Sequence, residues 1–130
     1  MNIFVNGTFD ILHRGHLEML EYAASLGSHL QIAIDTDRRV RELKGHGRPI
    51  NNQEDRRFML SRLKGVSGVV LFDSDDELEH LIQVYQPDIM VKGSDYRNKP
   101  IIGEEHCREI VFYEHTNHST TKLMQRIADR

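Results

Sequence analysis

The sequence predicts an α/β fold with a doubly wound parallel sheet of about five strands, because short apolar segments alternate with amphipathic helical segments along the chain. The apolar segments are continuous rather than alternating with polar residues, which is typical of strands covered by helices on both faces. Most of them are followed by a turn signal and a helical pattern, as expected for strand–helix–strand units. These observations indicate a parallel sheet but do not determine the order of its strands.

The predicted strands are the five segments that share this apolar character. They are Ile3–Val5, Leu30–Ile34, Val69–Phe72, Ile89–Val91 and Ile110–Phe112. Parallel strands end at the same edge of a sheet, and open α/β sheets bind ligands outside that carboxyl edge. We therefore expect functional side chains in the segments that directly follow the strands.

Helical periodicity fills the intervals between most of these strands. The predicted helices are one through Leu17, Tyr22 and Leu26 that ends at Gly27, one over Glu54–Leu63, one from Leu78 to Tyr85 that stops before Pro87, and one from Ser119 through Ile127. Between two of the helical stretches, Lys44–Asn52 is rich in Gly, Pro and Asn and is predicted to be a loop. A second break is expected at Gly93–Gly103.

Length and composition exclude several classes of protein. A chain of 130 residues and 15.1 kDa suits a single domain over residues 1–130. The only cysteine, Cys107, excludes a disulfide framework and a cysteine-based zinc module, and suits a reducing compartment. The sequence has no apolar segment of the roughly 20 residues that span a membrane, and it has no signal-peptide pattern. We therefore expect a cytoplasmic protein with no membrane partner.

Positive charge is concentrated in one part of the sequence, although the net charge is only −3. Between Arg38 and Lys64, nine basic and three acidic residues leave an excess of six positive charges. Phe58 is the one Phe, Tyr or Trp residue of this segment, which therefore lacks the repeated aromatic interleaving of a nucleic-acid binder and favours a compact anion. Within it, we expect Arg38, Arg39 and Arg41 to form a solvated helix face.

The segment after the first strand carries the most specific chemical signal. Gly7 allows a ligand to approach the backbone closely. His13 and His16 lie at the start of the next predicted helix, where backbone N–H groups and the helix dipole favour phosphate. Taken alone, the two histidines favour the interpretation as ordinary helix-start residues, and a metal pair would lack a third ligand at a fixed spacing.

The surrounding residues resemble the signature of the cytidylyltransferase-like nucleotidyltransferases, within the HxGH superfamily. The matching residues are Gly7, Thr8, Phe9, Asp10, His13, Gly15 and His16, followed in family order by Leu43–Gly45, Gly47–Pro49, Glu54–Arg56, Val91–Tyr96 and Ser119–Thr121. The resemblance covers nearly the whole chain. It implies a Rossmann-like nucleotidyltransferase fold.

Within this family the chain is most similar to the adenylyltransferase domain of the bacterial ADP-heptose synthases. That domain has a Leu-Lys-Gly-x-Gly-Arg-Pro loop and a Lys-Gly-Gly-Asp-Tyr motif, in which Ser94 here replaces the second glycine. The glycerol-3-phosphate cytidylyltransferases share the first and last motifs. They usually have an Arg-Thr-x-Gly-Ile run where this chain has Glu114–His118, which favours the adenylyltransferase interpretation.

The resemblance implies that an acceptor phosphate attacks the α-phosphorus of ATP or CTP in line and releases pyrophosphate. The implied catalytic residues are His13, His16 and Lys44. The implied nucleotide-binding residues are Gly7, Thr8, Phe9, His13, His16, Lys92, Gly93, Asp95, His118, Ser119, Thr120 and Thr121, and those implied to contact the acceptor or a phosphate are Lys44, Arg56 and Asp10. Mg²⁺ is expected on the triphosphate rather than in a site made by the protein alone.

Several residues keep a second interpretation. Asp10 could equally brace the turn between Thr8 and His13, and Lys92 could be an edge residue at the end of its strand. The expected partners are a nucleoside triphosphate and a phosphorylated sugar or polyol, and the resemblance further implies a homodimer. The alternative from another class is a non-catalytic nucleotide-binding module.

Overall fold

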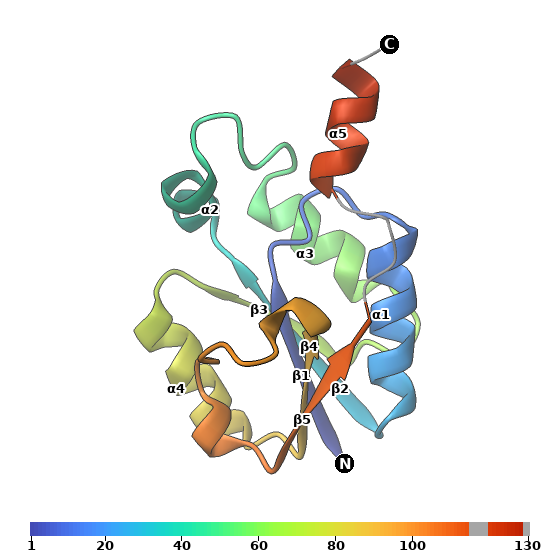
Figure 1. Ribbon diagram of the computed structural model, residues 1–130, viewed down its shortest axis with the longest axis vertical. Helices are drawn as coiled ribbons and strands as arrows, with labels where there is room; N and C mark the ends of the chain where they lie inside the picture. Colours follow the sequence, from blue (N-terminus) through green and yellow to red (C-terminus); the bar gives the residue numbers. More distant parts are fainter. Residues whose placement is uncertain (115–119, 129–130) are drawn as a thin grey trace.

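Five parallel strands form one sheet in the order β3-β2-β1-β4-β5 (Figure 1). They are β1 (Asn2–Gly7), β2 (His29–Asp35), β3 (Gly68–Phe72), β4 (Ile89–Gly93) and β5 (Glu109–Tyr113). The computed structural model describes residues 1–114 and 120–128. All five predicted strands are confirmed, and each is one to three residues longer than its apolar segment. The fold is Rossmann-like, as expected.

Helices connect the strands and cover both faces of the sheet (Figure 1). They are α1 (Arg14–Ser25), α2 (Asp37–Lys44), α3 (Gln53–Ser61), α4 (Asp75–Tyr85) and α5 (Thr120–Ala128), with short 3₁₀ turns η1 (Ser94–Tyr96) and η2 (Glu104–His106). Helices α1 and α3 pack on one face, and α4 packs on the other. Among the described residues, none of the helices has both the length and the apolar character needed to cross a membrane.

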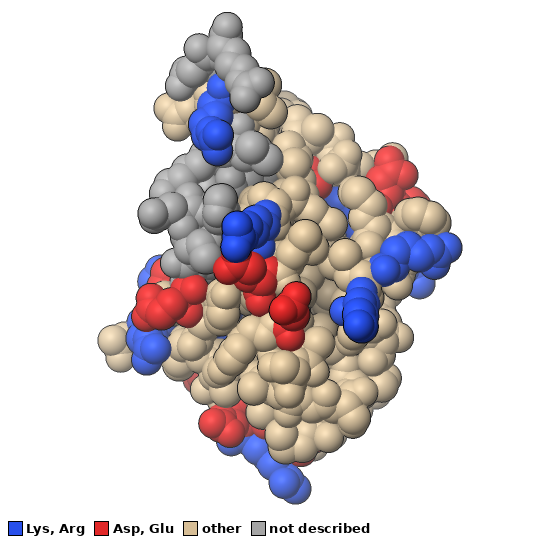
Figure 2. All heavy atoms as spheres, turned by 90° about the vertical axis from the view of Figure 1, so that its right-hand side faces the viewer, with Lys and Arg blue, Asp and Glu red and all other residues tan. Residues whose placement is uncertain are grey.

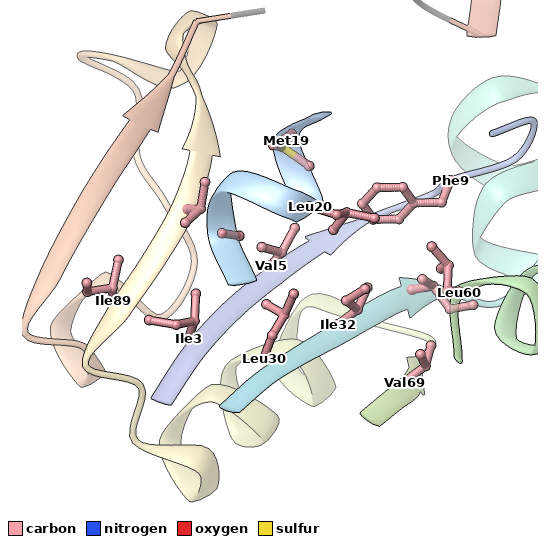
Figure 3. Close-up of a cluster of buried hydrophobic side chains, with 13 residues drawn as sticks. Ile3, Val5, Phe9, Met19, Leu20, Leu30, Ile32, Leu60, Val69 and Ile89 are labelled. Atoms are coloured by element: carbon pink, nitrogen blue, oxygen red, sulfur yellow. The ribbon is translucent and has the colours of Figure 1, made fainter. Parts of the chain in front are cut away.

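The larger hydrophobic core lies between the sheet and the helices α1 and α3 (Figure 3). Ile3 and Val5 of β1 point into it together with Leu30 and Ile32 of β2. Phe9, from the loop after β1, also packs into this core and is only 5% exposed. The core therefore holds in place the segment that leads from β1 to α1.

The opposite core packs α4 against the other face of the sheet and includes Phe4, Ala33 and Met90. Side chains in a strand alternate between the two faces, so the residue two positions beyond each of these lies on the same side. These residues are Asn6, Asp35 and Lys92. At its carboxyl edge, the α4 face thus changes from apolar to polar in three adjacent strands.

The central strand β1 is joined unequally to its two neighbours. It pairs with β2 through six residue pairs, from Asn2–His29 to Gly7–Ile34. It pairs with β4 through only two, Ile3–Ile89 and Phe4–Met90. The β1–β4 ladder therefore stops short of the carboxyl edge.

Candidate active site

A cavity of about 670 Å³ opens at the carboxyl edge of the sheet, where the fold class predicts a ligand site. Residues from the ends of β1, β2 and β4 line it, together with the start of α1 and the end of α2. Residues 100–102 form part of its wall. Seven of the residues singled out from the sequence line this one cavity: Gly7, Thr8, Phe9, His13, His16, Lys92 and Asp95. Asp10 and Lys44 line it as well.

The two histidines form one unit at the start of α1. The backbone N–H groups of Gly15 and His16 donate to Nδ1 of the N-cap residue His13 at 3.1 and 3.4 Å. In return, the backbone N–H of His13 donates to Nδ1 of His16 at 3.3 Å, and the two rings stack with centroids 3.8 Å apart. A neutral imidazole that accepts at Nδ1 carries its proton at Nε2. The reciprocal capping thus makes Nε2 of both rings a donor.

The ring of Phe9 packs against this histidine pair, and Gly7 leaves space for that ring. The ring of Phe9 packs edge-on against His16, with centroids 5.1 Å apart, and its backbone has a positive φ of 51°. A Cβ atom at Gly7 would lie 2.9 Å from the Phe9 ring. Close approach of the Phe9 ring is therefore a sufficient reason for glycine at this position, whereas the sequence suggested only close approach of a ligand.

Asp10 braces the loop that follows α2. Its buried carboxylate accepts hydrogen bonds from the backbone N–H groups of Ile50 and Asn51 at 2.9–3.0 Å. The side-chain amide of Asn51 donates to the carbonyl of Asp10 at 2.7 Å. The carboxylate is thus occupied by backbone donors of a distant loop, and not by the turn between Thr8 and His13 that the sequence suggested it could brace.

Arg56 differs from the sequence expectation of a phosphate contact. Its side chain is fully buried and does not line the cavity. Its guanidinium donates to the carbonyls of Thr8, Asp35 and Asn51 and pairs with the Asp37 carboxylate at 2.8 Å. The guanidinium N–H groups of Arg56 are therefore bonded to acceptors of the protein itself. Arg56 holds together the segments around the site instead of reaching a ligand.

Lys44, the last residue of α2, and Arg48, in the Gly45–Asn52 connection, bring positive charge to the cavity. Lys44 is exposed at the end of α2, which Gly45 terminates with a φ of 95°. A Cβ atom at Gly45 or Gly47 would meet no atom within 4 Å. The connection is thus anchored at α2 and at Asp10, and its intervening glycines stand in open space.

Lys92 lies inside the sheet and not at its edge, because β4 runs between β1 and β5. This excludes the edge-residue interpretation. Its Nζ donates to Oδ1 of Asn6 at 2.9 Å and lies 4.7 Å from the centre of the Tyr96 ring. Burial lowers the pKa of Lys92, while the carboxylates of Asp35 and Asp95 partly oppose that shift.

The turn after β4 contributes unequally to the cavity. Asp95 and Tyr96 of η1 line it, and both are exposed. Gly93, predicted to bind nucleotide, is buried at the end of β4 and does not line the cavity.

Arg39 is a cavity residue that sequence reasoning assigned to a solvated face. Its side chain is 16% exposed, pairs with Asp35 at 3.0 Å and Asp75 at 2.7 Å, and lies over the Phe72 ring at 5.2 Å. Arg38 and Arg41 match the expected exposed role, and Arg38 pairs with Glu42 and Asp73. The i, i+4 spacing of Asp35 and Arg39 was the available signal.

The last motif falls partly outside the described residues. His118 and Ser119 lie outside them, as do the side chains of Thr120 and Thr121. The described chain resumes with α5 at Thr120, one residue after the predicted N-cap. Their implied contacts with nucleotide remain predictions.

The donor set of the cavity fits a Mg²⁺ ion carried mainly by phosphate oxygens and water. Of the carboxylates that line the cavity, Asp10 is held by backbone N–H groups and Asp35 by Arg39. Within residues 1–114 and 120–128, the group of three potential ligands that lie close together is Glu79, Glu105 and His106, which does not line this cavity.

Figure 2 shows the face of the molecule that lies on the right-hand side of Figure 1, where α1 is found. Basic and acidic side chains are interspersed on this face, and much of the surface between them is uncharged. Leu17 and Tyr22 of α1 are exposed apolar residues. Among the described residues, this face shows no continuous positive surface of the kind that binds a nucleic acid backbone.

Comparison with known proteins gives concordant matches. The family model described as Cytidylyltransferase-like matches residues 4–126. The Bifunctional protein HldE of Campylobacter fetus subsp. fetus (strain 82-40) and that of Helicobacter pylori (strain Shi470) are each 44% identical over 126 residues, covering 96% of this chain. Each match covers 27% of the relative, so the chain spans about a quarter of the length of these curated relatives.

A solved structure matches the fold over most of its length. The lipopolysaccharide core biosynthesis protein from Thermoplasma volcanium GSS1 superposes with a TM-score of 0.70 and 25% sequence identity. The match covers 89% of this chain and 98% of the other.

Proposed function

This chain belongs to the cytidylyltransferase-like family of nucleotidyltransferases, and we propose that it transfers AMP from ATP to a heptose 1-phosphate with release of pyrophosphate. Two similarities support the choice of substrates. The HldE proteins match over nearly the whole chain, and the similar solved structure is that of a lipopolysaccharide core biosynthesis protein. The sequence motifs also resemble those of the adenylyltransferase domain of the ADP-heptose synthases.

The single observation that carries the proposal is the reciprocally capped pair His13–His16. Both rings line the cavity, and Nδ1 of each accepts from the backbone, so each presents a donor at Nε2. Such donors, set at the start of a helix, match the charge that develops on the α-phosphate and on the leaving pyrophosphate. A merely structural capping motif would not require that both rings also line a cavity.

In the proposed reaction, an oxygen of the acceptor phosphate attacks the α-phosphorus while the bond to pyrophosphate breaks on the opposite side. The protein provides orientation and charge stabilisation, so no covalent intermediate on a side chain is needed. His13 and His16 donate to the α- and β-phosphate oxygens. Lys44, at the exposed end of α2, adds a positive charge to the triphosphate, and Mg²⁺ carried by the triphosphate would neutralise further charge.

A panel of substrates tests this function. Pyrophosphate release is measured with each of ATP, CTP, GTP and UTP, in combination with heptose 1-phosphate, glycerol 3-phosphate or other phosphomonoesters, with Mg²⁺ and with EDTA. We expect the highest kcat/KM for ATP with heptose 1-phosphate, and loss of turnover with EDTA. A preference for CTP with glycerol 3-phosphate would replace the proposed substrates, and nucleotide binding without turnover of any pair would favour a non-catalytic module.

A further inference from the structure

Three polar side chains lie side by side on the α4 face at the carboxyl edge. Asp35 is the last residue of β2, Asn6 and Lys92 are the last residues but one of the adjacent strands β1 and β4, and all three line the cavity. The histidine pair begins α1, which packs on the other face of the sheet. The cavity thus has one set of polar groups on each side of the sheet edge.

The two basic residues on the α4 side of the cavity are neutralised to different extents. Arg39 forms ion pairs with Asp35 and Asp75, so two carboxylates offset its charge. Lys92 contacts the neutral amide of Asn6 and the ring of Tyr96, and no carboxylate of the described residues lies within ion-pair distance of its Nζ. A partly buried cation without a paired carboxylate is costly for the protein alone, and an anionic ligand would offset that cost.

We propose that Lys92 binds the phosphate group of the acceptor, on the α4 side of the sheet edge and opposite the histidine pair. This proposal rests on the proposed function, because it assigns one of that reaction's two anions to a residue. In-line attack requires the acceptor and the leaving pyrophosphate to lie on opposite sides of the α-phosphorus. With pyrophosphate next to His13 and His16, the attacking phosphate lies on the side where Lys92 stands.

The surroundings of Lys92 fit a phosphorylated sugar. The carboxylates of Asp35 and Asp95 line the same cavity and can accept hydrogen bonds from hydroxyl groups. Ile101 and Ile102 supply apolar wall for the carbon skeleton.

Lys92→Met tests the assignment, since it removes the charge and keeps an unbranched side chain. Lys64→Met is the matched control, because Lys64 is exposed and does not line the cavity. For Lys92→Met we expect the KM for heptose 1-phosphate to rise about tenfold or more, as for loss of a hydrogen bond to a charged group. The Kd for ATP should change less than about twofold, and Lys92→Arg should restore part of the acceptor affinity.

A tenfold loss of ATP affinity, with an unchanged KM for the acceptor, would overturn the proposal. Misfolding is excluded by thermal unfolding, in which Lys92→Met should be at least as stable as the wild type because it removes a partly buried charge.

A binding measurement separates this proposal from the proposed function. Heptose 1-phosphate and inorganic phosphate are titrated calorimetrically into the protein saturated with α,β-methylene ATP, so no turnover is needed. We expect heptose 1-phosphate to bind the wild type and to bind Lys92→Met at least tenfold more weakly. Equal binding by both proteins, or no binding by the wild type, would overturn the role of Lys92 even if turnover were observed. Specific binding without turnover would instead count against the enzymatic function alone.

Discussion

Arg56 and Lys92 both bring positive charge to the carboxyl edge of the sheet, Arg56 from α3 and Lys92 from β4, but the protein satisfies them unequally. Arg56 donates to three carbonyls and pairs with Asp37. Lys92 has a neutral amide and an aromatic ring as its neighbours. The corner around α3 is therefore complete without ligand, whereas the end of β4 retains capacity for an anion. The extent of neutralisation, more than burial, distinguishes a structural cation from one that binds substrate.

The largest effect should come from removing the structural cation. Arg56→Met would leave Asp37 and the carbonyls of Thr8 and Asp35 without their buried partner, so we expect the free energy of unfolding to fall by about 3–5 kcal/mol. Urea titration measures this change. The exposed neighbour provides the control, and Arg57→Met should stay within about 0.5 kcal/mol of wild type. Equal losses for both variants would remove the distinction between the two corners.

The next effect concerns catalysis rather than stability. His16→Ala should reduce kcat by roughly 10²–10³-fold, equivalent to about 2.7–4 kcal/mol, because one donor to the transition state is lost. His80 is exposed on α4, so His80→Ala should retain wild-type turnover. Pyrophosphate release gives the rates, and circular dichroism checks the fold. Unchanged turnover in His16→Ala would show that the pair serves only to cap α1.

A smaller effect is expected where Asp10 fastens the connection that carries Lys44. Asp10→Asn replaces one carboxylate oxygen by an amide donor facing the backbone N–H groups of Ile50 and Asn51. We expect about 1.5–3 kcal/mol lower stability, the range for a hydrogen bond to a charged group, with faster proteolysis between Gly45 and Pro49. Asp76→Asn at the exposed start of α4 should cost at most about 1 kcal/mol. Resistance to proteolysis equal to wild type would contradict the bracing role.

The smallest effect should be a pH dependence of the difference in stability between Lys92→Met and wild type. Because burial lowers the pKa of Lys92, the folded protein releases this proton at a lower pH than the unfolded chain, whose lysine titrates near 10.5. The cost of burying the charge therefore falls as pH rises toward 10.5. We expect the stability advantage of Lys92→Met over wild type to shrink across that range in urea titrations. A constant advantage would show that charge is not its origin.

Tyr85 also affects stability at high pH, but equally in wild type and in Lys92→Met. Burial raises the pKa of Tyr85 to about 12, so the folded protein retains this proton above pH 10, where the unfolded chain loses it. Its contribution to stability is therefore lost as pH rises from about 10 to 12, in wild type and variant alike. This contribution cancels in the difference between Lys92→Met and wild type.

The elements of the fold were predictable because they depend on local pattern. Apolar runs mark the strands, and helical periodicity marks α1, α3 and α4, whereas their N-caps, such as Asn52 and Ser74, were not identified from the sequence. The strand order depends on packing between distant segments, and no local pattern encodes it. The comparison with known proteins agrees with the family that the motifs predicted.

The candidate site was predictable where chemistry follows a motif, and less so where it depends on distant partners. The sequence could not show that the acceptors around Arg56 come from three separate segments, so it was expected to contact phosphate. Arg39 was missed because its second carboxylate, Asp75, lies 36 residues away on α4. In both cases the missing information was the identity of a long-range counter-charge.

The short ladder between β1 and β4 divides the sheet into two parts that are paired along only a short length. One part contains β3, β2 and β1, and the other contains β4 and β5. Backbone pairing between them ends at Phe4–Met90, and beyond it the side chain of Lys92 donates a hydrogen bond to Asn6. If the acceptor binds Lys92 as proposed, a substrate that also contacts His13 would connect the two parts of the sheet. Acceptor binding would then favour their alignment.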